Sequence, residues 1–110
     1  MLRRSFLAAL AASLVVAGCG SQQAEPVTVE LDVPKGGLSE TIEQPVPLGA
    51  EVTLVVTTAN DDGIHVHGYE FEFDTKAGEP ATKVFTANMA GAYEIESHDA
   101  NQVYMKLVVQ

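Results

Sequence analysis

The stretch "DDGIHVHGYEFEF", Asp61 to Phe73, alternates between apolar and polar residues after a turn-forming Asp-Asp-Gly. Alternation with a period of two is typical of a β-strand, in which successive side chains point to opposite faces. His65 and His67 therefore share one face of the predicted strand. Two imidazoles placed in this way can reach one metal ion, although two polar residues at a strand end are an equally simple interpretation.

The same period of two recurs in most of the chain that follows residue 26. Alternating or β-branched runs are "VTVELDV" (27–33), "EVTLVVTT" (51–58), "ATKVFTA" (81–87), "GAYEIES" (91–97) and "QVYMKLVV" (102–109). Prolines and glycines between residues 34 and 49 predict an interrupted edge strand there, because proline lacks the amide that a central strand must donate. No long stretch keeps a helical period, so we expect an all-β sandwich of about six to eight short strands.

The N-terminal stretch "MLRRSFLAALAASLVVAGC" (1–19) has the anatomy of a secretory signal. Arg3 and Arg4 form a positive region, and the apolar run that follows them is too short for a comfortable transmembrane helix. The run ends in "VAGC" (16–19), which resembles a bacterial lipobox. We therefore predict a signal peptide over residues 1–18 and a lipid-bearing N-terminus at Cys19. An ordinary signal peptide or an N-terminal anchor helix is the alternative.

The lipobox implies where the protein works. Two or more acyl chains on one cysteine give stable attachment, so the chain is expected to be anchored to a membrane without spanning it. Residues 19–26, "CGSQQAEP", would be the lipidated cysteine and a polar tether, and residues 27–110 the folded domain. We expect a location in the bacterial cell envelope, facing the periplasm or the exterior. The motif does not distinguish cells with one membrane from cells with two.

Composition limits the chemistry of the predicted domain. Cys19 is the only cysteine, so the domain has no thiol for a disulfide, a nucleophile or a thiolate metal ligand. The chain carries a formal net charge of -9, and from Cys19 onward four lysines stand against fifteen acidic residues. Such a surface argues against nucleic acid as a partner and against adsorption to anionic lipid headgroups. The membrane contact expected here is therefore the lipid, not charge.

From about Val27 to Gln110, the order of the elements resembles that of the cupredoxin-like family. The similarity is carried by "DDGIHVHGY" (61–69), by "KAGEPATKVFTA" (76–87) and by "GAYEIES" (91–97) followed by "YMKLVV" (104–109). The resemblance implies an all-β fold, a single small Greek-key β-sandwich that follows the cleaved signal peptide.

In copper-binding members of that family, an early strand supplies one histidine, and the loop after the strand similar to "GAYEIES" supplies cysteine, histidine and methionine ligands. The resemblance implies His65 or His67 as the early ligand, His98 as the loop histidine and Met105 as a weaker candidate. Ser97 stands where the family's cysteine would fall. Because a blue-copper centre depends on a copper–thiolate bond, we do not expect conventional blue-copper electron transfer.

A metal site without cysteine would rest on imidazoles. His65 and His67 could share one ion, and His98 could complete a three-imidazole set if its loop folds back toward them. Neutral imidazole suits Cu(II), Zn(II) and Ni(II), and Cu(II) has the highest intrinsic affinity among them. Copper is therefore the first choice and zinc the second.

Other polar residues near the histidines have a simple interpretation beside a functional one. Asp61, Asp62 and Asp99 could orient imidazoles or supply an oxygen ligand, while the first two also suit a turn. Met105 is in phase with the apolar residues of the last strand, which favours a core position. The acidic residues of "EFEFD" (70–74) are most simply a solvated strand face.

Two functions of different classes follow from these observations. The first is a lipid-anchored, extracytoplasmic protein that binds copper through histidines and works with an envelope redox or metal-transfer partner protein. The second is a metal-free interaction or structural module of the envelope that kept the fold and lost the copper site, as Ser97 suggests. We predict no enzymatic activity, because no catalytic triad or phosphate-binding loop is present. Redox chemistry at a histidine-only copper centre ranks third.

Overall fold

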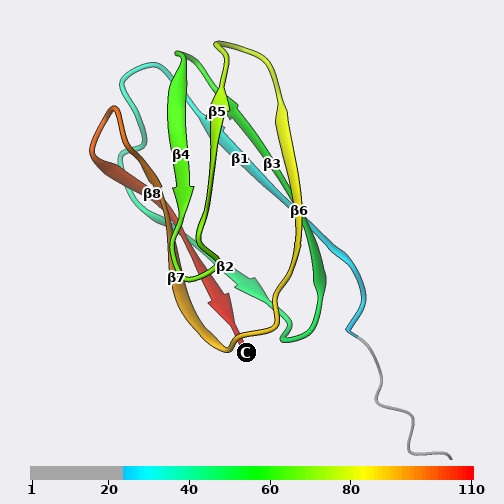
Figure 1. The fold of residues 1–110 in the computed structure, drawn as a ribbon. Helices are drawn as coiled ribbons and strands as arrows, with labels where there is room; N and C mark the ends of the chain where they lie inside the picture. The colour runs from blue at the N-terminus through cyan, green and yellow to red at the C-terminus, as the bar shows by residue number, and fades with distance from the viewer. Residues whose placement is uncertain (1–23) are drawn as a thin grey trace, which may run out of the picture.

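The computed structural model describes residues 24–110, and these residues form eight β-strands (Figure 1). The predicted signal peptide, the lipobox and Cys19 lie outside the described residues. Within residues 24–110, no helix is long and apolar enough to cross a membrane. The strands are β1 (Val27–Val33), β2 (Ile42–Val46), β3 (Glu51–Thr58), β4 (Asp62–Val66), β5 (Phe71–Thr75), β6 (Ala81–Thr86), β7 (Gly91–Ser97) and β8 (Gln102–Val109).

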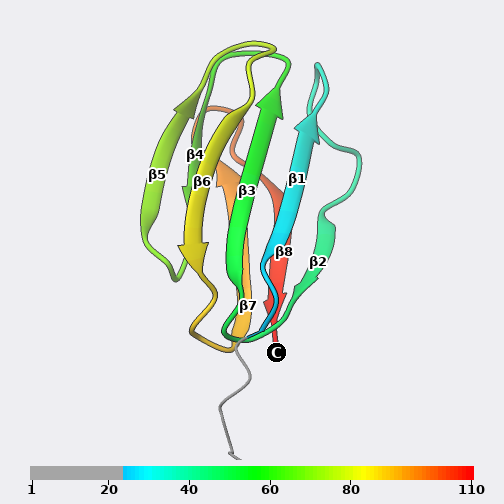
Figure 2. The same cartoon turned by 90° about the vertical axis from the view of Figure 1, so that its right-hand side faces the viewer.

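The strands build two sheets that face each other (Figure 2). The smaller sheet has the order β1-β3-β6, and the larger sheet has the order β2-β8-β7-β4-β5. β1 pairs with β3 and β2 pairs with β8 in parallel, while the other neighbours are antiparallel. Because β2 lies in the other sheet, the chain crosses the sandwich between the two parallel partners β1 and β3. The predicted all-β sandwich of short strands is confirmed.

The core lies between the sheets and comes from the inward half of each alternating strand. Leu31 and Leu54 are completely buried in the small sheet, as are Ile64 and Ile95 in the large sheet. Full burial of an aliphatic side chain of this size contributes about 1.5–3 kcal/mol. Since the only cysteine of the sequence is Cys19, this apolar core holds the two sheets together without a disulfide.

The segment broken by prolines and glycines forms an edge, as predicted. β2 lies at one end of the large sheet and contacts only β8 within it. It contains Pro45, which can be accommodated where one side of the strand has no neighbour. The opposite edge of the same sheet is β5, so the histidine strand β4 lies inside the sheet, between β5 and β7.

The last strand contains an irregularity that the sequence pattern does not predict. Alternation predicts that Val103 shares the inward face with Met105, but Val103 is only half-buried. The register between β7 and β8 shifts between Ile95 and Glu96, which leaves Tyr104 as an extra residue on β8. Such a β-bulge turns two consecutive side chains to one side. Tyr104 and Met105 are therefore both buried, with exposures of 2% and 1%.

Candidate metal centre

The candidate centre lies on the outer face of the large sheet, where β4 runs between β5 and β7. His65 of β4 stands opposite Glu96 of β7 and opposite Glu72 of β5. The neighbours of His65 along the chain, Ile64 and Val66, are completely buried. Because side chains alternate along a strand, His65 points away from the core and has an acidic residue on each side.

A first group, called here the inner set, consists of His65, His67 and Glu96. The two imidazole rings lie 4.2 Å apart between their centroids. Glu96 Oε1 lies 2.5 Å from His67 Nε2 and 3.4 Å from His65 Nδ1, so one carboxylate oxygen faces both rings. The hydrogen bond with His67 holds the pKa of the Glu96 carboxyl below its ordinary value of 4.5. The inner set therefore contains a charged carboxylate at neutral pH.

A second group, the outer set, shares His65 and adds Glu72 and His98. The His98 amide donates a hydrogen bond of 2.8 Å to the carbonyl of Gly63, which keeps His98 beside β4 after β7 has ended. His98 Nε2 lies 3.1 Å from Glu72 Oε1, and the His98 ring centroid lies 5.7 Å from that of His65. The hydrogen bond with Glu72 raises the pKa of His98 above its ordinary value of 6.5.

A tight turn directly after β4 brings one more carboxylate to His65. Gly68 has a φ of 83°, and a Cβ at this position would overlap the ring of Tyr93. Glu70 also has a positive φ, 52°, which is uncommon for a residue other than glycine. The Glu70 carboxylate accepts a hydrogen bond from the Gly68 amide at 3.1 Å and lies 3.7 Å from His65 Nε2. Both ring nitrogens of His65 therefore face acidic side chains.

The structure divides the predicted three-imidazole set into two overlapping groups. In each group every side chain offers one ligand atom, and these atoms lie within 4.8 Å of one another. Among residues 24–110, no such group contains His65, His67 and His98 together. Met105 packs in the core, on the opposite face of the sheet from the histidines, so the structure brings it into neither group.

Glu72 and Glu96 are the site residues that the sequence analysis does not single out. It assigns Glu72 to a solvated strand face and gives Glu96, in "GAYEIES" (91–97), no ligand role. A signal for them is present in the pattern. "HVH", "EFE" and "EIE" each place like residues on one face of their strands, so pairing of these strands puts glutamates beside histidines. Strand neighbours and register are not visible in a single sequence, and a shift of one residue would place these side chains on opposite faces.

At one end of the interior, β4, β7 and β8 share a hydrogen-bond network. Asp62, which is 9% exposed, accepts hydrogen bonds from Ser97 Oγ at 2.5 Å, from the Tyr104 hydroxyl at 2.7 Å and from the Gly63 amide at 2.8 Å. Ser97 Oγ also accepts a hydrogen bond from the Ala100 amide at 2.8 Å. Burial raises the pKa of Tyr104 above its ordinary value of 10.0, so its hydroxyl remains a donor at neutral pH.

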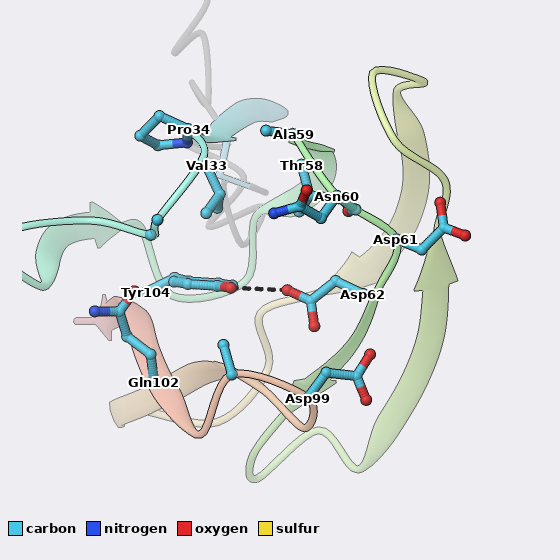
Figure 3. A pocket seen from close by; sticks show the side chains of 13 residues that line it. Val33, Pro34, Thr58, Ala59, Asn60, Asp61, Asp62, Asp99, Gln102 and Tyr104 are labelled. Carbon is cyan, nitrogen blue, oxygen red and sulfur yellow. Dashed lines mark hydrogen bonds between the residues drawn. The ribbon is translucent and has the colours of Figure 1, made fainter.

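This network borders a pocket of about 390 Å³ at the end of the sandwich (Figure 3). Asp62 and Tyr104 point toward each other there, joined by their hydrogen bond (Figure 3). In the part of the chain that the structure describes, every buried side-chain nitrogen or oxygen has a hydrogen-bond partner. Ser97, the residue in the predicted cysteine position, is thus part of a satisfied polar network, and the pocket contains no orphaned buried group that calls for a metal.

The expectation that aspartates orient the imidazoles is wrong for Asp62, because its carboxylate faces the interior network and not the histidines. Asp62 is also a buried strand residue, not a turn residue. Asp61 does stabilise a turn, since its Oδ1 accepts a hydrogen bond from the Ala77 amide at 2.9 Å. Asp99 is exposed next to His98. The carboxylates paired with the imidazoles are those of Glu70, Glu72 and Glu96.

Each set offers two imidazole nitrogens and one carboxylate oxygen. This combination suits Cu(II) and Zn(II), and three protein ligands leave a coordination position for water or for a group from another molecule. A ring nitrogen that carries a proton must lose it before it can bind a metal. The residues therefore fit a divalent transition-metal ion on the exterior of the sheet.

Replacing Asp62 with alanine should lower the free energy of unfolding by about 3 kcal/mol, because the buried hydroxyls of Ser97 and Tyr104 lose their charged acceptor. Denaturant titration of the full chain measures this change. Asp99→Ala, which removes an exposed carboxylate, is the matched control and should change stability little. Equal stability of the two variants would contradict the structural role of Asp62.

Replacing Glu72 with glutamine should lower the pKa of His98 toward 6.5, because the hydrogen bond and the negative charge that favour the imidazolium are lost. Because the pKa of His98 is raised in the folded state, the His98–Glu72 pair stabilises the fold at pH values below the unfolded-state pKa of His98, as long as Glu72 is ionised. This stabilisation is lost as pH rises through the folded-state pKa of His98. Titration of the imidazole protons by NMR measures the shift. Glu94→Gln, on the same face, is the control, and an unchanged His98 pKa in Glu72→Gln would refute the assignment.

Comparison with known proteins finds similarity in structure and not in sequence. In sequence, the chain matches no protein-family model and no curated protein. In structure, it resembles a copper binding protein solved by NMR in the apo form, with a TM-score of 0.62 at 16% identity over 83% of this chain and 100% of that chain. It also resembles a mutant of amicyanin with Cu(I), with a TM-score of 0.53 at 24% identity over 76% of this chain and 82% of that chain.

Parts of larger proteins are similar as well. A mutant of the laccase from B. aclada gives a TM-score of 0.63 at 17% identity over 80% of this chain. The chain spans 23% of the length of that laccase and 64% of the matched chain of a heme-copper terminal oxidase. These likenesses, together with two sheets of three and five strands, show that the chain has a cupredoxin-like β-sandwich fold.

Proposed function

We propose that this chain is a lipid-anchored, extracytoplasmic protein that binds one copper ion through His65, with His67 and Glu96 as its partners. One observation carries the proposal: the ligand atoms of these three side chains already lie within 4.8 Å of one another. They come from β4, from the turn that follows it and from the paired strand β7, so the sheet holds them in place without a bound ion. Little rearrangement is then needed on binding.

The donor atoms and the neighbours of the fold support copper as the ion. Two imidazoles and a carboxylate are suitable for Cu(II), which exceeds Zn(II) in intrinsic affinity for a given nitrogen and oxygen site. Several structures with this fold are named for copper: the copper binding protein, the Cu(I) amicyanin and a copper nitrite reductase from Nitrosomonas europaea. Zinc is the second choice, on the donor atoms alone.

The proposed centre differs from a blue-copper site in its ligands and in its place. No cysteine occurs in residues 24–110, so the thiolate on which a blue-copper centre depends is missing from the domain. The Ser97 hydroxyl donates a hydrogen bond to the buried carboxylate of Asp62. The inner set lies on the outer face of the sheet, so an ion there would be held outside the core. Holding or passing copper suits this position better than fast electron transfer.

A metal-free interaction module is the second candidate, and one observation favours it. The imidazoles already have carboxylate partners, at 2.5 Å for His67 with Glu96 and 3.1 Å for His98 with Glu72, so these side chains are satisfied without an ion. Under this alternative, the pairs stabilise the outer face of the sheet and histidine substitutions leave metal affinity unchanged. The titration described next separates the two candidates.

Calorimetric titration of the purified native protein in detergent with Cu(II) tests the proposal. We expect one Cu(II) per chain, bound more tightly than Zn(II), with affinity that falls as pH is lowered because protons compete for the imidazoles. His65→Ala should weaken binding by at least roughly tenfold, since even residues that only support a ligand are worth about 10–100-fold.

Matched variants on one strand sharpen this titration. Glu96→Gln removes the carboxylate of the inner set, whereas Glu94→Gln removes an exposed carboxylate of the same strand that belongs to neither set. Weakening by the first and not by the second is expected. Equal Cu(II) affinity in the native chain and in a variant with all three histidines changed to alanine would refute copper binding by this site and favour the metal-free module.

The membrane anchor is tested separately from the metal. Cys19 is expected to carry the lipid, because "VAGC" (16–19) resembles a lipobox. The native chain should partition into the detergent phase and show the mass of an acylated N-terminus. Cys19→Ser should abolish both properties, and a native chain without lipid mass would contradict the anchor while leaving the copper proposal intact.

A further inference from the structure

His65 belongs to both possible ligand groups, and this sharing has a chemical consequence. The inner set is His65, His67 and Glu96, and the outer set is His65, Glu72 and His98. A neutral imidazole carries a proton on one ring nitrogen and a lone pair on the other, so it can bind one ion at a time. The two sets are therefore alternatives for one ion and not two independent sites.

The two sets differ in their exposure to solvent. In the inner set, the side chains of Glu96 and His67 are 30% and 44% exposed, whereas His98 and Glu72 in the outer set are 55% and 63% exposed. His65, which both sets use, is 14% exposed and is the most enclosed of the five side chains. The inner set is therefore the less exposed position, beside β7, and the outer set is the more exposed position, at the edge strand β5.

Charge does not oppose movement between the two positions. A carboxylate is present at each of them, and Glu70 Oε2 lies 3.7 Å from His65 Nε2. A divalent cation is thus accompanied by negative charge in either set. Each set supplies the same donor types, two imidazole nitrogens and one carboxylate oxygen, so neither position demands a different ion or oxidation state.

We propose that the outer set is the exchange position of the copper site: an ion is held in the inner set, passes to the outer set with His65 as a ligand in both positions, and is given up from there. The step is a ligand exchange in which the bonds to His67 and Glu96 break as the bonds to Glu72 and His98 form. A proton on the ligating nitrogen of His98 leaves before that nitrogen binds, and His67 can take up a proton when the ion leaves it. No electron is transferred. This inference rests on the proposed copper binding and adds a route by which the ion enters and leaves.

Paired variants of the full chain test the exchange position. Glu72→Gln with His98→Ala removes the outer set, Glu96→Gln with His67→Ala removes the inner set, and Glu94→Gln is the control. Electron paramagnetic resonance of the Cu(II)-loaded protein should show two signals in the native chain and the control. Each double variant should lose one of them, and the stoichiometry should be one ion in every case.

The rate at which EDTA removes Cu(II) supplies a second measurement. EDTA should remove Cu(II) roughly tenfold more slowly from the variant without the outer set, because the exit route with the lower barrier is deleted. The same variant should change the equilibrium affinity by less than about twofold, since a position that holds a minority of the bound ion contributes little to the total.

Three results would overturn this inference. Two ions bound per native chain would show that the sets are independent, and an unchanged spectrum and removal rate after loss of the outer set would show that the ion does not use it. Equal binding by the native chain and the chain without histidines would instead remove the proposed function itself. The first two results leave copper binding intact, so the failures are distinguishable.

Discussion

The pairing of β4 with β7 is the constraint on which the rest of the molecule depends. In this one register Ile64 stands opposite Ser97, and His65 stands opposite Glu96. The first pair faces the core and the second faces solvent, so the same set of backbone hydrogen bonds aligns the interior network and the candidate metal ligands on the exterior. A slip of one residue would bury the histidines and expose Ile64, which makes the register strongly specified by the apolar residues.

The fold thus keeps the interior polar network apart from the candidate metal ligands. At the end of β4, β7 and β8 that borders the pocket, Asp62, Ser97 and Tyr104 satisfy one another's polar groups. The candidate metal ligands lie instead on the outer face, where acidic side chains surround the imidazoles. An ion bound there would exchange with the surroundings more readily than a buried one, as the proposed role of holding or passing copper requires.

Much of the fold could be predicted from the sequence, because alternation along strands and proline-rich edges are local features. His65 and His67 on one face of β4 are predictable for the same reason. Two features are not local. The bulge that turns Tyr104 inward depends on how β8 pairs with β7, and the glutamates that meet the histidines depend on which strands are neighbours. The acceptor role of Asp62 follows from burial, which "DDG" (61–63) does not reveal.

The central claim is that copper binds on the outer face of the large sheet at His65. Crystals grown with one equivalent of Cu(II), measured at the copper absorption edge, locate the ion directly by anomalous scattering. The account predicts a peak bonded to His65 together with His67 and Glu96, or divided between that position and the one beside His98 and Glu72. A peak in the pocket beside Asp62 and Tyr104, or no peak at His65, would contradict it.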